Sequence, residues 1–472
     1  MKDRIDIKNI PADVKIHDPQ ADQVLDYNLR NRIYVRAVKG VHQILRRRMG
    51  FVFLGLFALI PWINYGDSQA ILFDIANQEF NIFGLTLWPQ DLTLFATILI
   101  ISAYALFFVT TFYGRVWCGY MCPQTVWTFI FIWFDEKLEG NANKRRKLDS
   151  MPMSFEKAWR KGLKHLAWVS VALLTSLTFV AYFIPAREVF LDFFTFNTSF
   201  AITAWTLFFA GATYINAGWM REVMCLHMCP YARFQSSMFD KDTFTVTYDF
   251  ERGEKRGPRS RKKDPKELGL GDCIDCNLCV QVCPTGIDIR NGLQYECINC
   301  GACIDACDET MEKMKYEKGL ISYTTEHSLE GKKTHIIRPK LFGYLAVITI
   351  MFAAFLWQLS ARVPFELNIE RDRNALYREN DEGLIENTYT LQVLNKSQQD
   401  HVYLIDIEGL KDYQYYGLRE FKVKSGEVYK TPISVAVDPY DLQKPVTDIV
   451  ITLTIKDGDT TVFEETRFFK GR

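Results

Sequence analysis

Long apolar stretches alternate with charged ones along this 472-residue chain. Five of them approach the length of about 20 residues that an α-helix needs to cross a bilayer. They cover residues 49–65, 92–112, 166–184, 200–218 and 341–360, and the first is the shortest. A further apolar run over 123–134 suits an interfacial or re-entrant helix, because it is too short to span. The pattern predicts an α-helical membrane bundle over 49–239 with four spans, followed later by a fifth transmembrane helix over 341–360.

Basic residues orient these spans, because Lys and Arg are enriched in cytoplasmic loops. Three arginines at 46–48 precede the first span, and nine Lys or Arg residues lie between 137 and 164. Residues 66–91 contain no Lys or Arg. This asymmetry predicts a cytoplasmic N-terminus, a cytoplasmic segment over 219–340 and an external tail after residue 362.

The two ends of the chain have patterns of their own. Residues 1–48 are mostly polar and predict a cytoplasmic arm without a secretory signal. In the tail, runs such as 389–394, 401–407 and 448–455 are rich in β-branched and aromatic residues, which is typical of strands. Over 362–472 these runs predict a C-terminal all-β sandwich of the immunoglobulin type. It has no disulfide, because residues 308–472 contain no cysteine.

The most specific chemistry lies in a cysteine-rich segment inside the region 240–340. Its two halves each read C-x2-C-x2-C-x3-C, which is the spacing of bacterial ferredoxins with two [4Fe–4S] clusters. In that arrangement the fourth cysteine of each half binds the other cluster. We therefore expect one cluster on Cys273, Cys276, Cys279 and Cys307, and the second on Cys297, Cys300, Cys303 and Cys283.

Two other uses of these eight cysteines are less compatible with the pattern. Zinc needs four thiolates per ion and has no use for the repeated x3 step. Disulfides are disfavoured in the cytoplasm, where the charge pattern puts this segment. One departure from the ferredoxin pattern is that Pro284 follows Cys283, whereas Asp308 follows Cys307. The segment 240–340 is thus predicted to be an inserted two-cluster ferredoxin-like module with its linkers.

A second cysteine motif, Cys-x-x-x-Cys-Pro, occurs twice, each time after a predicted span. The copies contain Cys118 and Cys122, and Cys225 and Cys229. Cysteines four apart share a helical face, and the proline can start a new helix. Four thiolates at one membrane face could bind copper, bind a third iron–sulfur cluster, or cycle between dithiol and disulfide. Methionines 121, 224 and 228 stand nearby as soft copper ligands. Cysteines that merely pack as small hydrophobic residues are the alternative.

Charge limits the range of partners. The net charge is +0, which gives no indication of a nucleic-acid partner. The basic run over 256–263 suits contact with anionic lipid headgroups.

With these motifs in this order, nearly the whole chain resembles the FixG/RdxA/CcoG family, whose members are accessory proteins for assembly of cbb-type cytochrome oxidases. The resemblance implies a bacterial inner-membrane protein with a periplasmic C-terminal domain. It also implies a cupric reductase that supplies Cu(I) to the oxidase, with Cys118, Cys122, Cys225 and Cys229 in the copper chemistry. Oxidase subunits or copper-delivery factors would be its partners.

The membrane half is also similar to NapH-type proteins, which take electrons from quinol. Two alternatives to cupric reduction therefore stay open. One is a quinol-linked electron carrier with no copper substrate, and the other is a non-enzymatic scaffold for oxidase assembly. The electron donor, a quinol or a cytoplasmic protein, is left undefined by the sequence.

Overall fold

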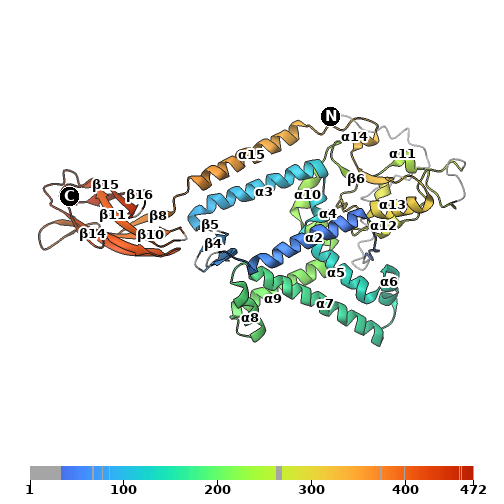
Figure 1. The fold of residues 1–472 in the computed structure, drawn as a ribbon, viewed down its shortest axis with the longest axis horizontal. Coiled ribbons are helices and arrows are strands. Elements are labelled where there is room, and N and C mark those ends of the chain that lie inside the picture. Colours follow the sequence, from blue (N-terminus) through green and yellow to red (C-terminus); the bar gives the residue numbers. More distant parts are fainter. Residues whose placement is uncertain are drawn as a thin grey trace.

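The computed structural model describes residues 33–470 apart from 66–67, 77, 84, 262–267, 373–374, 398, 457 and 459. Long helices separate a cysteine-rich module at one end of the molecule from a β-sandwich at the other (Figure 1). Most of the predicted N-terminal arm, residues 1–32, lies outside the described residues, as do residues 262 and 263 of the basic run.

Four helices among the described residues are long and apolar enough to cross a membrane. They are α3 (Leu92–Tyr113), α7 (Phe155–Val180), α9 (Phe200–Tyr214) with its π-helical continuation η4 (Ile215–Met220), and α15 (Pro339–Ser360). The chain is therefore membrane-associated, and four of the five predicted spans are confirmed as such helices. α7 begins eleven residues earlier than predicted, since a charged first turn precedes its apolar part.

The first predicted span, over 49–65, differs from the structure. The helix there, α2 (Val41–Leu59), contains the three arginines and is not one of the four apolar helices. A 3-10 turn η2 (Ile60–Trp62) and strand β1 (Asn64–Tyr65) follow it. The Arg46 guanidinium lies 3.7 Å from the centre of the Phe129 ring, so tertiary packing accommodates a charge inside the helix. α2 still runs from the cysteine-rich end toward the opposite end (Figure 1).

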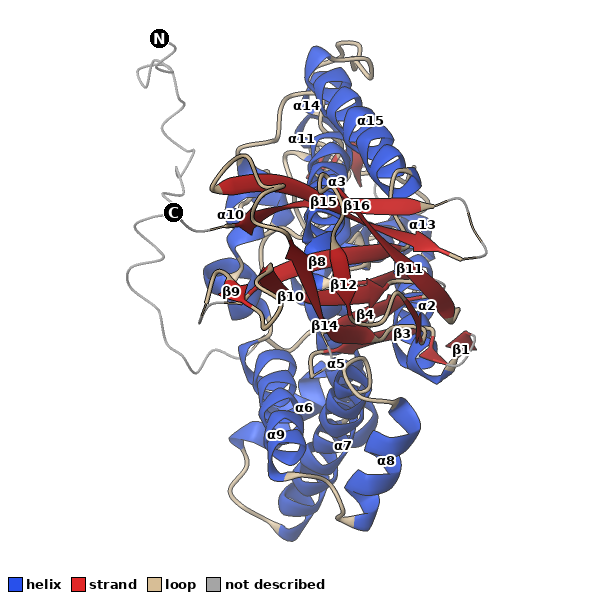
Figure 2. Cartoon of the chain, turned by 90° about the vertical axis from the view of Figure 1, so that its left-hand side faces the viewer, coloured by secondary structure: helices blue, strands red, loops and turns tan. Residues whose placement is uncertain are grey.

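The helices form two groups, which are separate when the molecule is viewed from the β-sandwich end (Figure 2). α3 packs against α15, and α7 packs against α9 and α5 (Pro123–Glu139). Buried Phe131, Trp168, Ala172 and Ala217 form the core of the second group. α5 is the predicted short helix over 123–134, and it has 17 residues.

Short elements connect the long helices. Between α2 and α3 lie β2 (Ser68–Gln69), β3 (Ile71–Asp74), β4 (Glu79–Ile82), β5 (Leu85–Leu87) and the turn η3 (Pro89–Asp91). The other connections contain α4 (Val116–Tyr120), α6 (Ala142–Ser150), α8 (Ala186–Thr195), the π-helical η5 (Met224–Met228) and α10 (Pro230–Ser236).

The cysteine-rich module is closed by an antiparallel pair of strands, β6 (Thr245–Tyr248) and β7 (Ile321–Thr324). Between these strands the chain forms α11 (Phe250–Gly253), α12 (Leu278–Gln281), the 3-10 turn η6 (Ile289–Asn291) and α13 (Ala302–Met314). Helix α14 (Glu326–Leu329) follows β7. The buried side chains of the pair pack directly against the cysteines.

The predicted immunoglobulin-like sandwich is confirmed. One sheet has the order β12-β14-β10-β8 with β9 beside β10, and the other has the order β13-β11-β15-β16. The strands are β8 (Phe365–Arg371), β9 (Arg378–Glu379), β10 (Ile385–Asn395), β11 (His401–Glu408), β12 (Gln414–Tyr416), β13 (Glu420–Val423), β14 (Val428–Val437), β15 (Val446–Ile455) and β16 (Thr461–Phe469). Alternate residues of the long strands are buried, so the two sheets share one core. An ion pair of 2.7 Å between Arg362 and Asp91 joins the sandwich to the start of α3.

Candidate metal centre

The fold sorts the eight cysteines of the module into two cavities. Each cavity is lined by one of the two sets predicted from the spacing, and Cys279 borders both. The first cavity contains Cys273, Cys276, Cys279 and Cys307, and the second contains Cys283, Cys297, Cys300 and Cys303. The last cysteine of each half therefore lies with the first three of the other half.

The spacing of the thiols suits a cluster better than a single ion. A zinc ion with Zn–S bonds of about 2.3 Å holds its thiolates about 3.8 Å apart. Among the described residues, which include every cysteine, none of the module's eight cysteines belongs to a group of three metal-binding side chains whose ligand atoms lie within 4.8 Å of one another. A four-iron cube is larger than one ion and separates its ligands further. The donor sets therefore fit two [4Fe–4S] clusters.

Left-handed backbone conformations shape both cysteine loops in the same way. Asp275 and Asn277 flank Cys276 with φ values of 55° and 54°, and Asn299 and Gly301 flank Cys300 with 51° and 70°. Asp, Asn and Gly are the residues that adopt this conformation most readily. The repeat in sequence is thus also a repeat in backbone geometry.

Arg290 holds the first loop in place. Its buried guanidinium donates to Asp275 at 2.5 Å, to Asn277 at 2.6 Å and to Asp288 at 2.6 Å. Burial raises the pKa of the Cys279 thiol to about 12, and the positive charge of Arg290 opposes that rise. This role was not predictable from the sequence, because Arg290 lies outside the cysteine motif.

Asp308, which departs from the ferredoxin pattern, has a structural use. Cys307 lies inside α13, where a following proline would remove a helical hydrogen bond. The Asp308 carboxylate instead accepts a hydrogen bond of 2.9 Å from the backbone of Gly319.

The two Cys-x-x-x-Cys-Pro motifs lie at helix junctions. Cys118 is in α4 and Cys122 precedes Pro123, the first residue of α5. Cys225 is in η5, and Cys229 precedes Pro230, the first residue of α10. The expectation that each proline starts a new helix is confirmed. The two cysteines of a motif do not share one continuous helix, because the chain turns between them.

The thiols of the two motifs interact with each other. Burial raises the pKa of Cys118 and of Cys225 to about 12, and a charge on Cys122 would raise both further. The nearby Arg115 guanidinium opposes this rise at both sites. These thiols keep their protons at neutral pH, so a metal ion that binds them must displace protons.

Gln235 of α10 lies beside Cys118. Its side chain is fully buried, and its Oε1 accepts a hydrogen bond of 3.6 Å from the Cys118 Sγ. The Gln235 amide also forms a side-chain hydrogen bond with the Tyr231 hydroxyl of the same helix. Sequence reasoning missed this residue, since it lies six positions after Cys229.

The first motif contacts the second cysteine set directly. Cys118 packs against a buried group that includes Ile298 and Cys300. A methyl group placed on Gly119 would come within 2.9 Å of the Cys300 Cα, so only glycine allows this approach. The Arg115 guanidinium also lies 4.7 Å from the centre of the Tyr295 ring. The membrane thiols and the second cavity are therefore neighbours.

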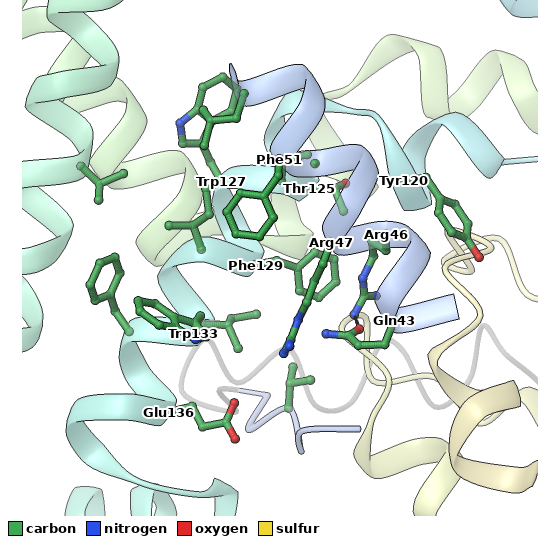
Figure 3. Close-up of a pocket in the computed structure, with 18 of the residues that line it drawn as sticks. Gln43, Arg46, Arg47, Phe51, Tyr120, Thr125, Trp127, Phe129, Trp133 and Glu136 are labelled. Carbon is green, nitrogen blue, oxygen red and sulfur yellow. Dashed lines mark hydrogen bonds between the residues drawn. The ribbon is translucent and has the colours of Figure 1, made fainter. Parts of the chain in front are cut away.

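A large cavity of about 590 Å³ opens beside this contact, between α2, α5 and α7 (Figure 3). Its walls are mostly apolar, and the polar side chains that line it include Gln43, Arg46, Arg47, Tyr120 and Glu136. The Arg46 side chain is buried, and among the described residues its Nη1 has no hydrogen-bond partner. The cavity also reaches Gly119 and Val282, which adjoin the second cysteine set.

The fold and the cysteine sites define a membrane-associated iron–sulfur protein of the electron-transfer class. Three family models match the chain: a 4Fe-4S binding domain at 95–139, a 4Fe-4S dicluster domain at 220–326, and the Ig-like fold at the C-terminus of FixG at 355–471. The chain is 33% identical to the nitrogen fixation protein FixG of Rhizobium meliloti, over 81% of this chain and 80% of that protein.

Two proteins of Cereibacter sphaeroides are similarly related. RdxA is 36% identical, over 81% of this chain and 83% of its own length, and RdxB is 37% identical, over 82% and 84%. The chain belongs to the FixG family. A crystal structure of a FixG-related protein from Vibrio parahaemolyticus matches 23% of this chain and 98% of its own, with 40% identity and a TM-score of 0.22.

Proposed function

We propose that this protein reduces Cu(II) to Cu(I) and supplies Cu(I) for assembly of a cbb-type cytochrome oxidase. In this proposal the first cavity's four cysteines hold one [4Fe–4S] cluster and the second cavity's four hold the other. When bound, the clusters supply one-electron redox chemistry. The thiols of Cys118, Cys122, Cys225 and Cys229 bind the copper substrate.

The observation that carries this proposal is the packing of Cys118 against Ile298 and Cys300. The thiols that would meet copper lie beside the loop that would hold the second cluster. Soft thiolates prefer Cu(I) to Cu(II), so binding at these thiols favours the reduced ion. The buried Gln235 amide places a polar side chain directly beside the Cys118 thiol.

We further propose that the cysteine-rich module is cytoplasmic and that the β-sandwich is periplasmic, in a bacterial inner membrane. The two parts lie at opposite ends of the long helices (Figure 1). The lysines and arginines of α6 and of the first turns of α7 lie toward the cysteine-rich end, which suits a cytoplasmic side. Oxidase subunits or copper-delivery factors would then meet the sandwich.

The test is a double variant, Cys118→Ser with Cys122→Ser. Purified anaerobically, it should keep its full content of iron and acid-labile sulfide. After its clusters are reduced with dithionite and the excess reductant is removed, it should lose the formation of Cu(I) that a Cu(I)-specific chelator reports when Cu(II) is added. Met153→Leu is the control, since Met153 lies outside both cysteine motifs and its side chain is 80% exposed. Cupric reduction at the wild-type rate in the double variant would refute the proposal.

A second candidate function, oxidation of a membrane quinol, is favoured by the cavity between α2, α5 and α7. Its volume of about 590 Å³ is in the range of small-molecule sites, and apolar walls with a few polar groups suit a quinone ring with an isoprenoid tail. The buried Arg46 Nη1 could donate to a quinone oxygen. Oxidation of a quinol releases two electrons and two protons, and the hydrogen-bonded pair Tyr120 and His42 could receive a proton. Quinol would then be the electron donor, with or without copper as acceptor.

Two substitutions on α2 test the cavity. Leu54 lines it, whereas Leu56 is 52% exposed and does not. Leu54→Trp should slow quinol-driven reduction of the protein by at least about tenfold, which corresponds to ~1.4 kcal/mol. Leu56→Trp should have no effect. Equal rates of quinol-driven reduction in both variants would contradict quinol oxidation in this cavity and would favour a soluble cytoplasmic electron donor.

A further inference from the structure

Three metal-binding side chains meet at a place that the cysteine centres do not use. Asp242, His327 and His335 each bring a ligand atom to within 4.8 Å of the other two. Asp242 lies before β6, His327 in α14, and His335 in the segment before α15. Asp242 lies 85 positions before His327 and 93 positions before His335 in the chain. No sequence motif therefore predicts that the three residues meet.

We propose that Asp242, His327 and His335 form a binding site for a divalent transition-metal ion, and that Cu(II) binds it most tightly. Two imidazoles and a carboxylate offer nitrogen and oxygen donors, which suit Cu(II) and Zn(II). At a site of given ligands Cu(II) binds more tightly than the other divalent ions of the first row. The remaining coordination positions would be open to water.

The distances fit an ion after small side-chain movements. His327 Nδ1 lies 2.8 Å from Asp242 Oδ1, and His335 Nδ1 lies 3.8 Å from the same oxygen. Neighbouring ligands about 2.0 Å from a square-planar Cu(II) ion are roughly 2.8 Å apart, which the first distance already matches and the second exceeds by about 1 Å. The two imidazole rings have centroids 6.1 Å apart and are nearly perpendicular.

Backbone hydrogen bonds hold the three residues in place. The N–H of His335 donates to Asp242 Oδ1 at 2.9 Å, and the N–H of His327 donates to the Lys241 carbonyl at 3.1 Å. A purely structural role explains the hydrogen bond between His327 and Asp242. It does not explain the ring of His335, which is 70% exposed and lies beyond hydrogen-bond distance of Asp242. An ion entering from solvent would meet this ring first.

The surrounding charges allow a cation. Lys241, which precedes Asp242 in the chain, forms ion pairs with Glu326 at 3.2 Å and Glu330 at 3.7 Å, so its charge is balanced. The Asp242 carboxylate then gives the site a net negative charge.

The position of the site relates it to the membrane thiols. The Thr243 hydroxyl donates to the Thr111 carbonyl at 3.0 Å, and the Phe244 N–H donates to the Phe112 carbonyl at 3.0 Å. The site is thereby attached to the end of α3, which leads into the first cysteine motif. A role in collecting Cu(II) before reduction rests on the proposed cupric reduction, whereas binding of the ion does not.

The test uses full-length protein without a histidine tag, with its clusters oxidised and no reductant present. One equivalent of Cu(II) should give an EPR signal with coupling to two imidazole nitrogens. His335→Gln should remove one nitrogen coupling and weaken Cu(II) binding by at least about tenfold. Because the His335 side chain is exposed, its substitution should not disturb folding. His327→Gln tests the second imidazole ligand in the same way. His401→Gln, in the β-sandwich, is the matched control.

An unchanged spectrum and affinity in His335→Gln, or no nitrogen-coupled signal in the wild type, would overturn the proposal. Because the assay measures binding without electron transfer, it is independent of the reductase assay. A protein that binds Cu(II) here but never reduces it would refute only the proposed function.

Discussion

Gly119 lies against the backbone of Ile298, so close that a methyl group on Gly119 would stand 2.7 Å from the Ile298 carbonyl oxygen. Gly119 belongs to the first Cys-x-x-x-Cys-Pro motif, and Ile298 lies in the second cysteine loop of the ferredoxin-like module. This contact joins a membrane helix junction to an iron–sulfur loop. It makes the first motif and the second cysteine loop direct neighbours.

Gly119→Ala should disturb this contact. The added methyl group meets backbone atoms, which cannot move aside as a flexible side chain would, so we expect a loss of stability of roughly 1–3 kcal/mol. The second cluster's EPR signal should change, and cupric reduction should fall. Gly55→Ala on α2 is the control, because nothing lies within 4 Å of its added methyl group. Identical EPR spectra for Gly119→Ala and the wild type would mean that the contact is not tight.

Arg290→Gln should release the first cluster selectively. It removes the charged hydrogen bonds to Asp275 and Asp288 and leaves two carboxylates without their shared partner, at a cost of about 1.5–3 kcal/mol. We expect iron to fall from about eight to about four atoms per chain, with the signal of the second cluster preserved. Lys313→Gln on α13, an exposed position, should keep all its iron. Loss of both clusters would show that Arg290 supports the whole module.

Asp305→Asn should loosen the attachment of α2 to the module. The Asp305 carboxylate accepts hydrogen bonds from the backbone N–H groups of His42 at 3.1 Å and Gln43 at 2.8 Å, at the N-terminus of α2. Loss of such a charged cap costs about 0.5–2 kcal/mol. Thermal unfolding in detergent should occur at a lower temperature than in the wild type. Glu309→Gln is an exposed substitution on α13, the helix that also contains Asp305, and it should unfold at the same temperature as the wild type.

The proposed orientation can be tested by cysteine labelling of intact cells. Tyr440→Cys introduces a thiol at a position that is 96% exposed on the β-sandwich. A membrane-impermeant maleimide added outside should label this variant once the outer membrane is opened. Lys313→Cys should react only after the inner membrane is also opened. The reverse pattern would invert the topology.

Spacing and periodicity predicted much of this architecture. The division of the eight cysteines into two sets of four follows from their spacing in the sequence. Three closely spaced thiols can bind one [4Fe–4S] cluster, and the fourth cysteine of the same half cannot reach that cluster. The sandwich follows from alternation, which Tyr389, Leu391 and Val393 retain as buried residues of β10. These features depend on neighbours in the sequence.

Features that depend on distant partners were not predictable. In the sequence Arg46 precedes the first predicted span, but in the structure it lies inside α2, where its guanidinium stacks on Phe129. Gln235 and Arg290 acquire their roles only because folding brings them to Cys118 and Asp275. The meeting of Asp242 with His327 likewise needs β6 and β7 to pair first.

The most direct test of the central claim is a count of iron, acid-labile sulfide and copper in anaerobically purified protein, with EPR before and after Cu(II) is added. The account predicts about eight irons per chain. It also predicts that the EPR signals of dithionite-reduced clusters disappear as Cu(II) takes their electrons, and that the wild type retains the resulting Cu(I) whereas the Cys118→Ser, Cys122→Ser variant does not. About twelve irons would assign the membrane thiols to a third cluster, and a colourless, iron-free protein would contradict the account as a whole.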